Sequence, residues 1–147
     1  MNKIYKITLF FYLVTNILNV SISNEKFFDK GLQFYENKKY EEAKFMFEKS
    51  IVYNPKDSNS YLYLAKIYNI AENQKQEEKN LETTLIIEPD NEEAILMTMK
   101  IALKKSNYSK VKVLSKTFTE VCKKLCDENE NILKTLGNLE PKNNESW

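Results

Sequence analysis

The chain has 147 residues, the length of one domain, and its 22 basic side chains, all lysine, stand against 21 carboxylates. This near-neutral balance gives no reason to expect a nucleic-acid partner, and 2 Gly and 3 Pro are few for a β-rich fold with tight turns. Histidine is absent and the sequence has no Gly-rich phosphate loop, so it predicts no catalytic residue, no metal site and no cofactor.

Residues 1–23 have the layout of a secretory signal peptide. Lys3 and Lys6 give the positive start, an apolar run follows, and Ser21 and Ser23 have the small-x-small spacing of a cleavage site. We therefore expect export, into a bacterial periplasm, with a mature chain that begins at Asn24.

Two alternatives for this leader stay open. An uncleaved membrane anchor is one, because Ile4 to Ile22 is 19 residues long, although Asn16 and Asn19 are costly in hydrocarbon. A buried first helix of the fold is the other, although the apolar run is continuous and lacks a helical stripe. A lipoprotein is disfavoured because no Cys follows the run.

Amphipathic patterns and turn signals after the leader predict helices only. We expect them over residues 25–37, 40–53, 59–71, 74–87, 91–105, 108–125 and 128–136. Pro55 and Pro89 end the second and fourth helices, and Asp57 or Ser58 caps the third. Gly31 lies inside the first helix, which predicts the close approach of a neighbouring helix.

The helices recur with a period of 34 residues, the spacing between Pro55 and Pro89 and between Tyr40, Gln74 and Tyr108. A single helical hairpin cannot bury its apolar faces, but stacked copies can. The sequence therefore predicts a stack of about three hairpins, with an unrelated bundle of hairpins as the alternative.

Signature residues recur at matching positions of these units. The first unit has Phe27, Lys30-Gly31, Phe34, Ala43, Phe47 and Pro55. The second has Tyr61, Leu64-Ala65, Tyr68, Leu81 and Pro89, with Glu77 in place of the small Ala. The third is weaker and has Lys123 at the proline position. From about Asn24 to Leu125 the chain thus resembles the tetratricopeptide repeat family, which implies an all-α, right-handed α-solenoid with a C-terminal capping helix.

The end of the chain predicts that cap. Asp127 with Glu130 is an N-cap signal for the last helix, and Gly137 is expected just after its end. Terminal repeats usually need a capping helix with a polar outer face. We assign residues 24–138 to the repeat domain, including the cap, and residues 139–147 to a polar tail.

Cys122 and Cys126 are the two cysteines of the chain. In an exported protein an even count favours a disulfide, which would tie the last repeat helix to the cap, aided by a break near Cys126-Asp127. Two free thiols are the alternative. A redox catalyst is disfavoured because the spacing is not C-x-x-C.

The resemblance also implies a binding groove, because the first helix of each repeat lines a concave surface that holds a peptide or a partner helix. The corresponding positions are Phe28, Asp29, Leu32, Tyr35, Leu62, Tyr63, Lys66, Asn69, Leu96, Met97, Lys100 and Leu103. This apolar and aromatic set suits an amphipathic or extended apolar segment. The family's clamp for a C-terminal carboxylate is not expected, because Phe28 and Leu32 stand where it needs Lys and Asn. Packing against neighbouring helices, or a second copy in the groove, is the alternative.

The function expected from this resemblance is a non-catalytic, exported module that binds a peptide or protein partner in the groove. A membrane-anchored assembly factor, which presents a client to an envelope complex, is the alternative if the leader is retained. An enzyme is disfavoured for lack of catalytic groups. Nothing in the sequence identifies the partner or the pathway.

Overall fold

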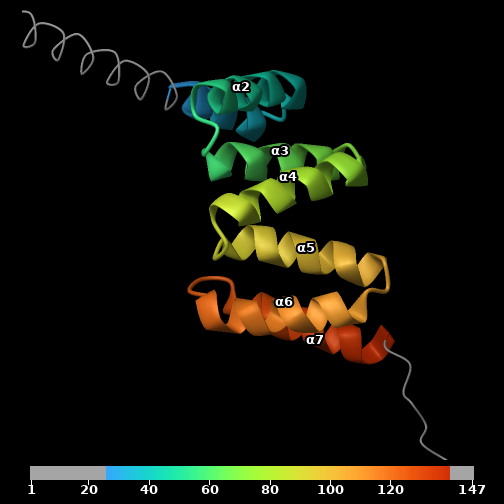
Figure 1. The fold of residues 1–147 in the computed structure, drawn as a ribbon. Helices are drawn as coiled ribbons and strands as arrows, with labels where there is room; N and C mark the ends of the chain where they lie inside the picture. Colours follow the sequence, from blue (N-terminus) through green and yellow to red (C-terminus); the bar gives the residue numbers. More distant parts are fainter. Residues whose placement is uncertain (1–25, 140–147) are drawn as a thin grey trace, which may run out of the picture. The chain divides into compact units, whose positions relative to one another are not determined.

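The structure is a computed structural model that describes residues 26–139, so the predictions for the leader and for residues 140–147 of the tail lie outside it. The regular elements of the described part are all helices, as predicted (Figure 1). They are residues 26–36, α2 (Tyr40–Tyr53), α3 (Ser58–Ile70), α4 (Gln74–Ile87), α5 (Glu92–Lys104), α6 (Tyr108–Val121) and α7 (Cys126–Leu139). No helix within this part is long and apolar enough to cross a membrane.

The chain divides into two compact units, and the boundary falls within α4, between Glu77 and Glu78. The first unit contains the helix over 26–36, α2 and α3. The second contains most of α4 together with α5, α6 and α7.

In the first unit, Ala43, Phe47, Leu64 and Ile67 form the buried core. Gly31 is buried against this core, and a Cβ atom added to it would lie 2.6 Å from Cε1 of Phe47. The predicted close helix approach at Gly31 is confirmed, because any larger residue would meet the Phe47 ring.

The start of α3 is fixed by Asp57, which confirms one of the two predicted caps. Its carboxylate accepts the backbone N–H of Ser60 at 3.2 Å and also the hydroxyl groups of Ser60 and Ser50, at 2.6 Å and 2.8 Å. Both serines are fully buried, so these hydrogen bonds tie the end of α2 to the start of α3 without leaving a hydroxyl unpaired.

The repeat is visible in the backbone of the turn within each hairpin. Lys38, Glu72 and Ser106 have φ values of 58°, 55° and 54°, and they are spaced 34 residues apart. Around each of them the same backbone hydrogen bond recurs: Lys39 to Phe34, Asn73 to Tyr68, and Asn107 to Ala102. This is the Schellman motif, which usually places Gly at the left-handed position. Here Lys, Glu and Ser adopt the left-handed conformation in place of glycine, so the amino-acid types at these positions did not predict the motif.

In the second unit, α5, α6 and α7 share one core. Ile95, Leu96, Met99, Ala102, Val111 and Phe118 are buried together with Ile132 and Leu136 of α7. A buried hydrogen bond from the Ser115 hydroxyl to Asn129 Oδ1, 2.8 Å long, joins α6 to α7. The last helix therefore packs against both helices of the third hairpin.

The predicted boundary between the last two helices is wrong. Helix α6 ends at Val121 and not at Leu125, and α7 already begins at Cys126, which leaves Asp127 in its first turn and not at the N-cap. The expected end at Gly137 is wrong as well, because α7 continues to Leu139. The break between the helices thus precedes Cys126.

The physical reason for the early end of α6 is a long-range hydrogen-bond acceptor. The carboxylate of Glu92, at the start of α5, accepts the backbone N–H groups of Lys123, Lys124 and Leu125 at 2.9–3.0 Å. In a continuing helix these groups would bond to carbonyls four residues earlier. Their capture by Glu92 favours a turn instead.

Candidate functional site

The structure brings four of the predicted groove residues together in the first unit. Phe28, Leu32 and Tyr35 lie on the helix over 26–36, Tyr63 lies on α3, and all four are partly buried. The Tyr63 ring stacks on Phe47 at 5.2 Å and meets Phe28 and Tyr35 edge-on at 5.8 Å and 5.1 Å. These residues are therefore one rigid aromatic cluster with an accessible edge.

The charge on this cluster comes from Lys66, whose Nζ atom lies 4.3 Å from the centre of the Tyr63 ring. An ammonium group over a tyrosine face is a cation–π contact. The cluster can therefore contact an apolar or aromatic side chain through its rings and an acidic group through Lys66. We call Phe28, Leu32, Tyr35, Tyr63 and Lys66 the aromatic face.

Asn69, the remaining exposed groove position of α3, is engaged within the unit. Its Nδ2 atom donates a 2.8 Å hydrogen bond to Oε1 of Glu77. Glu77 stands where the repeat pattern has a small residue, and its carboxylate is buried, with the residue 4% exposed. Asn69 satisfies that carboxylate, so we assign it a structural role.

Two of the predicted groove residues do not lie on an accessible surface. Leu62 and Leu96 are each 4% exposed, so the prediction that they line a groove is wrong. Leu62 shares a buried face of α3 with Ala65, three residues later. Leu96 belongs to the core that α5 forms with Ile132 of α7.

Among the other groove positions on α5, Leu103 and Lys100 have contacts to the shared core and to α7. Leu103 packs against the same core, and Met97 is partly buried. Lys100 is exposed, and its Nζ atom lies 3.6 Å from Oε2 of Glu128 on α7. In the second unit, α7 therefore occupies the side of α5 that the sequence analysis assigned to a ligand.

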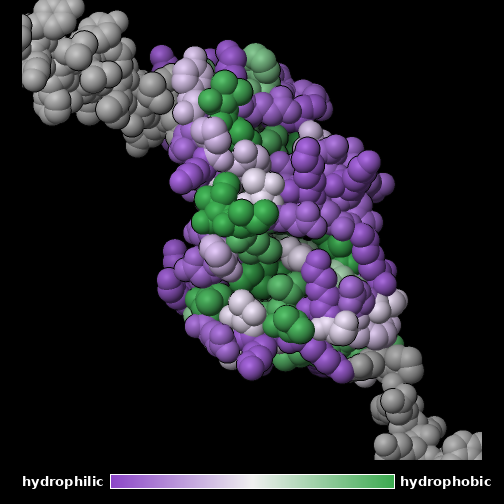
Figure 2. Space-filling view, viewed as in Figure 1, coloured by the Kyte–Doolittle hydropathy of each residue, from purple (hydrophilic) through white to green (hydrophobic). Residues whose placement is uncertain are grey.

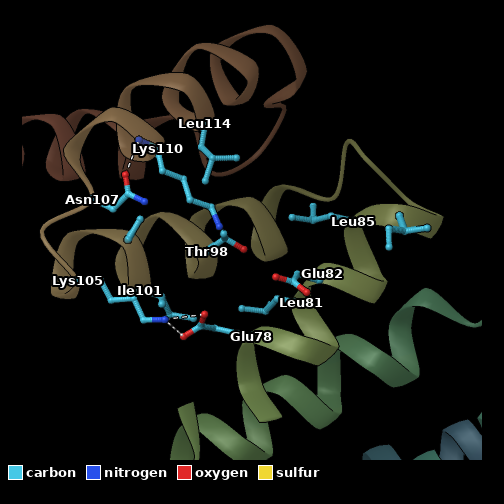
Figure 3. A pocket seen from close by; sticks show the side chains of 12 residues that line it. Glu78, Leu81, Glu82, Leu85, Thr98, Ile101, Lys105, Asn107, Lys110 and Leu114 are labelled. Atoms are coloured by element: carbon cyan, nitrogen blue, oxygen red, sulfur yellow. Dashed lines mark hydrogen bonds and ion pairs between the residues drawn. The ribbon is translucent and has the colours of Figure 1, made fainter. Parts of the chain in front are cut away.

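A pocket that was not predicted from the sequence lies elsewhere in the second unit (Figure 3). It has a volume of about 440 Å³, opens to solvent and is lined by α4, α5 and the start of α6. Its lining residues are Glu78, Leu81, Glu82, Leu85, Ile86, Thr98, Ile101, Ala102, Lys105, Asn107, Lys110 and Leu114. An ion pair between Lys105 Nζ and Glu78 Oε1, 2.6 Å long, joins two of its walls.

One signal for this pocket was present in the sequence. Leu85, Ile86 and Ile87 are consecutive apolar residues at the end of a helix, and a helix cannot turn all three toward one core. In the structure Ile86 is 80% exposed at the pocket. Figure 2 shows a hydrophobic patch over the C-terminal end of α4 that continues toward α5 and α6.

The turn between α6 and α7 contains the two cysteines, which form the predicted disulfide with their Cα atoms 5.4 Å apart. The backbone N–H groups of Lys124, Leu125 and Lys123 hold the pKa of the Glu92 carboxyl below its ordinary value of 4.5. Glu92 therefore stays ionised and holds the turn. Within residues 26–139, no group of three or more Cys, Asp or Glu side chains is placed to hold a metal ion.

Comparisons with known proteins bear on the fold. Residues 46–79 match the sequence model of the tetratricopeptide repeat. A search of curated proteins gave no significant match. Among solved structures, the tetratricopeptide repeat domain of OM64 from Arabidopsis has a TM-score of 0.70 and 16% identity, with 81% of this chain and 98% of that chain covered.

Two further similar structures contain bound peptides. The first tetratricopeptide repeat domain of Spaghetti, bound to an HSP90 peptide, has a TM-score of 0.69 and 15% identity, covering 80% of this chain and 93% of that one. The secretion chaperone SycD of Yersinia enterocolitica, in complex with a peptide of the translocator YopD, has a TM-score of 0.69 and 14% identity, covering 78% and 92%. The match over residues 46–79 and the shared folds confirm the all-α solenoid class and the resemblance to tetratricopeptide repeat domains.

Proposed function

We propose that this chain is a non-catalytic interaction module that binds a peptide segment of a partner protein on its aromatic face. The observation that carries the proposal is the cluster of partly exposed rings around Tyr63, held 5.1–5.8 Å apart and joined by the Lys66 ammonium. Tyrosine is enriched among the residues that dominate binding energy at interfaces. The peptide complexes of two proteins with the same fold support the same kind of ligand.

The rigidity of the face favours binding. Phe47 is fully buried, and Gly31 lets it pack closely beneath Phe28 and Tyr63. Rings fixed in this way lose little conformational entropy when a ligand covers them. The preferred ligand is thus an apolar or aromatic segment with an acidic residue that reaches Lys66.

Export of the protein is part of the proposal. Disulfides persist in oxidising compartments, and the pairing of Cys122 with Cys126 supports the expectation drawn from the leader. The membrane-anchored alternative would use the same aromatic face. The exported and the membrane-anchored forms differ in the N-terminus of the mature chain, so direct sequencing of the native protein distinguishes them.

The experiment is a selection of random displayed peptides against the protein, followed by mapping of the selected peptides with amide chemical shifts. We expect enrichment of aromatic and acidic residues, with shifts in the helix over 26–36 and in α3. Lys66→Glu should weaken the selected peptides, because it replaces an attractive charge with a repulsive one. Lys79→Glu, the same change at an exposed residue of α4, is the matched control.

Lys66 is a better test site than Tyr63. Because the Tyr63 ring stacks on a fully buried ring, its truncation would disturb packing and binding together. Selected peptides that show no composition preference, or that bind Lys66→Glu as well as the parent, would contradict the proposal.

A further inference from the structure

We propose that the pocket of the second unit is a separate docking site, and that it takes an amphipathic segment of a partner protein with apolar side chains between a basic and an acidic residue. The pocket residues Thr98 and Ile101 of α5, and Lys105 at its C-cap, lie on a different face from Leu96 and Lys100, which α7 engages. The site is therefore independent of the aromatic face and of the packing of α7.

The floor of the pocket is apolar. Leu81, Ile101 and Ala102 are at most 5% exposed, and the partly buried Leu85 and Leu114 flank them. The volume of about 440 Å³ falls within the range of ligand-binding pockets. Large apolar side chains of a ligand would therefore find both space and an apolar surface.

The rim adds an apolar residue that the protein itself leaves in water. Ile86 lines the pocket and is 80% exposed. An isolated exposed isoleucine needs no explanation, but one that continues an apolar pocket extends the surface that a segment can cover. A segment longer than one side chain fits this arrangement.

The charges of the pocket define the ends of the ligand. Glu78 and Lys105 already neutralise each other. Glu82 on the α4 wall and Lys110 on the α6 wall form no ion pair within residues 26–139 (Figure 3). Glu82 would repel an anionic ligand, Lys110 would repel a cationic one, and a wholly apolar ligand would gain nothing from either charge. A ligand with a basic group toward Glu82 and an acidic group toward Lys110 satisfies both.

The test uses three synthetic helical peptides of about 12 residues, or about three helical turns. Each is rich in alanine and carries Leu and Phe four residues apart, so that both lie on one face. One peptide has Lys at one end and Glu at the other, the second has Lys at both ends, and the third has Glu at both. Titrations monitored by amide chemical shifts give the affinity and the site. We expect the mixed peptide to bind about threefold to tenfold more tightly than the others, because rim charge pairs are worth about 0.2–1 kcal/mol each.

Charge reversal in the protein makes the test specific. Lys110→Glu should shift the preference to the doubly basic peptide, and Glu82→Lys should shift it to the doubly acidic one. Ile86→Ser should weaken all three peptides. These residues are exposed, so the variants keep the fold, and Lys116→Glu on α6 outside the pocket is the matched control.

Three results would overturn the proposal. The first is the absence of saturable shifts at the pocket residues with any of the peptides. The second is a preference that does not follow the charge reversals. The third is self-association of the chain that Ile86→Ser abolishes, since a second copy would then be the occupant. The first result includes shifts confined to the helix over 26–36 and α3, which would assign the peptides to the aromatic face.

Discussion

The two glycines of the chain should respond in opposite directions to the same substitution. Gly31 and Gly137 both lie inside helices, where Ala is favoured over Gly by about 1 kcal/mol. At Gly137 an added Cβ would meet no atom within 4 Å, so Gly137→Ala should stabilise the protein by about 1 kcal/mol. At Gly31 the added Cβ would lie 2.6 Å from the Phe47 ring.

The magnitude at Gly31 depends on whether the Phe47 ring can move. The ring is fully buried, and the rings of Phe28 and Tyr63 pack on it at 5.7 Å and 5.2 Å. Overpacking of a closed core typically costs about 1–3 kcal/mol, which exceeds the gain in helix propensity. Gly31→Ala should therefore destabilise the protein by up to about 2 kcal/mol, and Gly31→Leu should destabilise it more.

Urea unfolding measures both effects, since about 1 kcal/mol moves the midpoint by roughly 0.3–1 M for a small domain. Phe47→Leu supplies the control, because it opens space beside residue 31. In that background Gly31→Ala should cost less than it does in the parent chain, and the double-mutant cycle gives the coupling. A stabilising Gly31→Ala, or equal costs in the two backgrounds, would refute the packing argument.

Three further predictions concern the second unit and the leader. Because the folded-state pKa of Glu92 is depressed, its contribution to stability is present above its ordinary pKa of 4.5 and is lost as the pH falls through the folded value. Glu92→Gln should therefore lower the free energy of unfolding near neutral pH. The difference in this free energy between the variant and the parent should shrink as the pH is lowered. Ser106→Gly should stabilise by about 0.5–1 kcal/mol, because φ at this residue is 54° and glycine adopts this region at no steric cost; a lower thermal midpoint would contradict it. N-terminal sequencing of the native protein should begin at Asn24, and a soluble chain that begins at Met1 would rule out export by cleavage.

Helix bounds were predicted best where the 34-residue repeat and a local signal, such as a proline after the helix, indicate the same position. Helices α2 and α4 have the predicted bounds, because Tyr40 and Gln74 mark the same step of the repeat and Pro55 and Pro89 follow the ends. The prediction failed at the end of α6, where Lys123 replaces the proline. There the helix is ended by a carboxylate about thirty residues earlier, which no local pattern encodes.

The candidate site could be predicted from the sequence only in part, because local spacing shows which residues share a helix face but not what packs against that face. Helical spacing places Phe28, Leu32 and Tyr35 on one face of their helix, and the structure packs all three against the core of the first unit. Burial of Leu62 and Leu96 depends on what packs against their helices. Resemblance to a family pattern assigns positions to a face, but it does not say whether this chain covers that face.

Helix α7 explains why the two units differ in the surface they offer to a ligand. It buries Leu96 in a common core with Ile132, and it brings Glu128 to within 3.6 Å of Lys100. A peptide on this side of α5 would therefore have to displace a packed helix that the disulfide at Cys122 also anchors to α6. The opposite face of α5 carries no such cost, because the pocket beside α4 is already open. Binding in the second unit should thus leave α7 in place, and the amide signals of α7 should remain unchanged when the pocket fills.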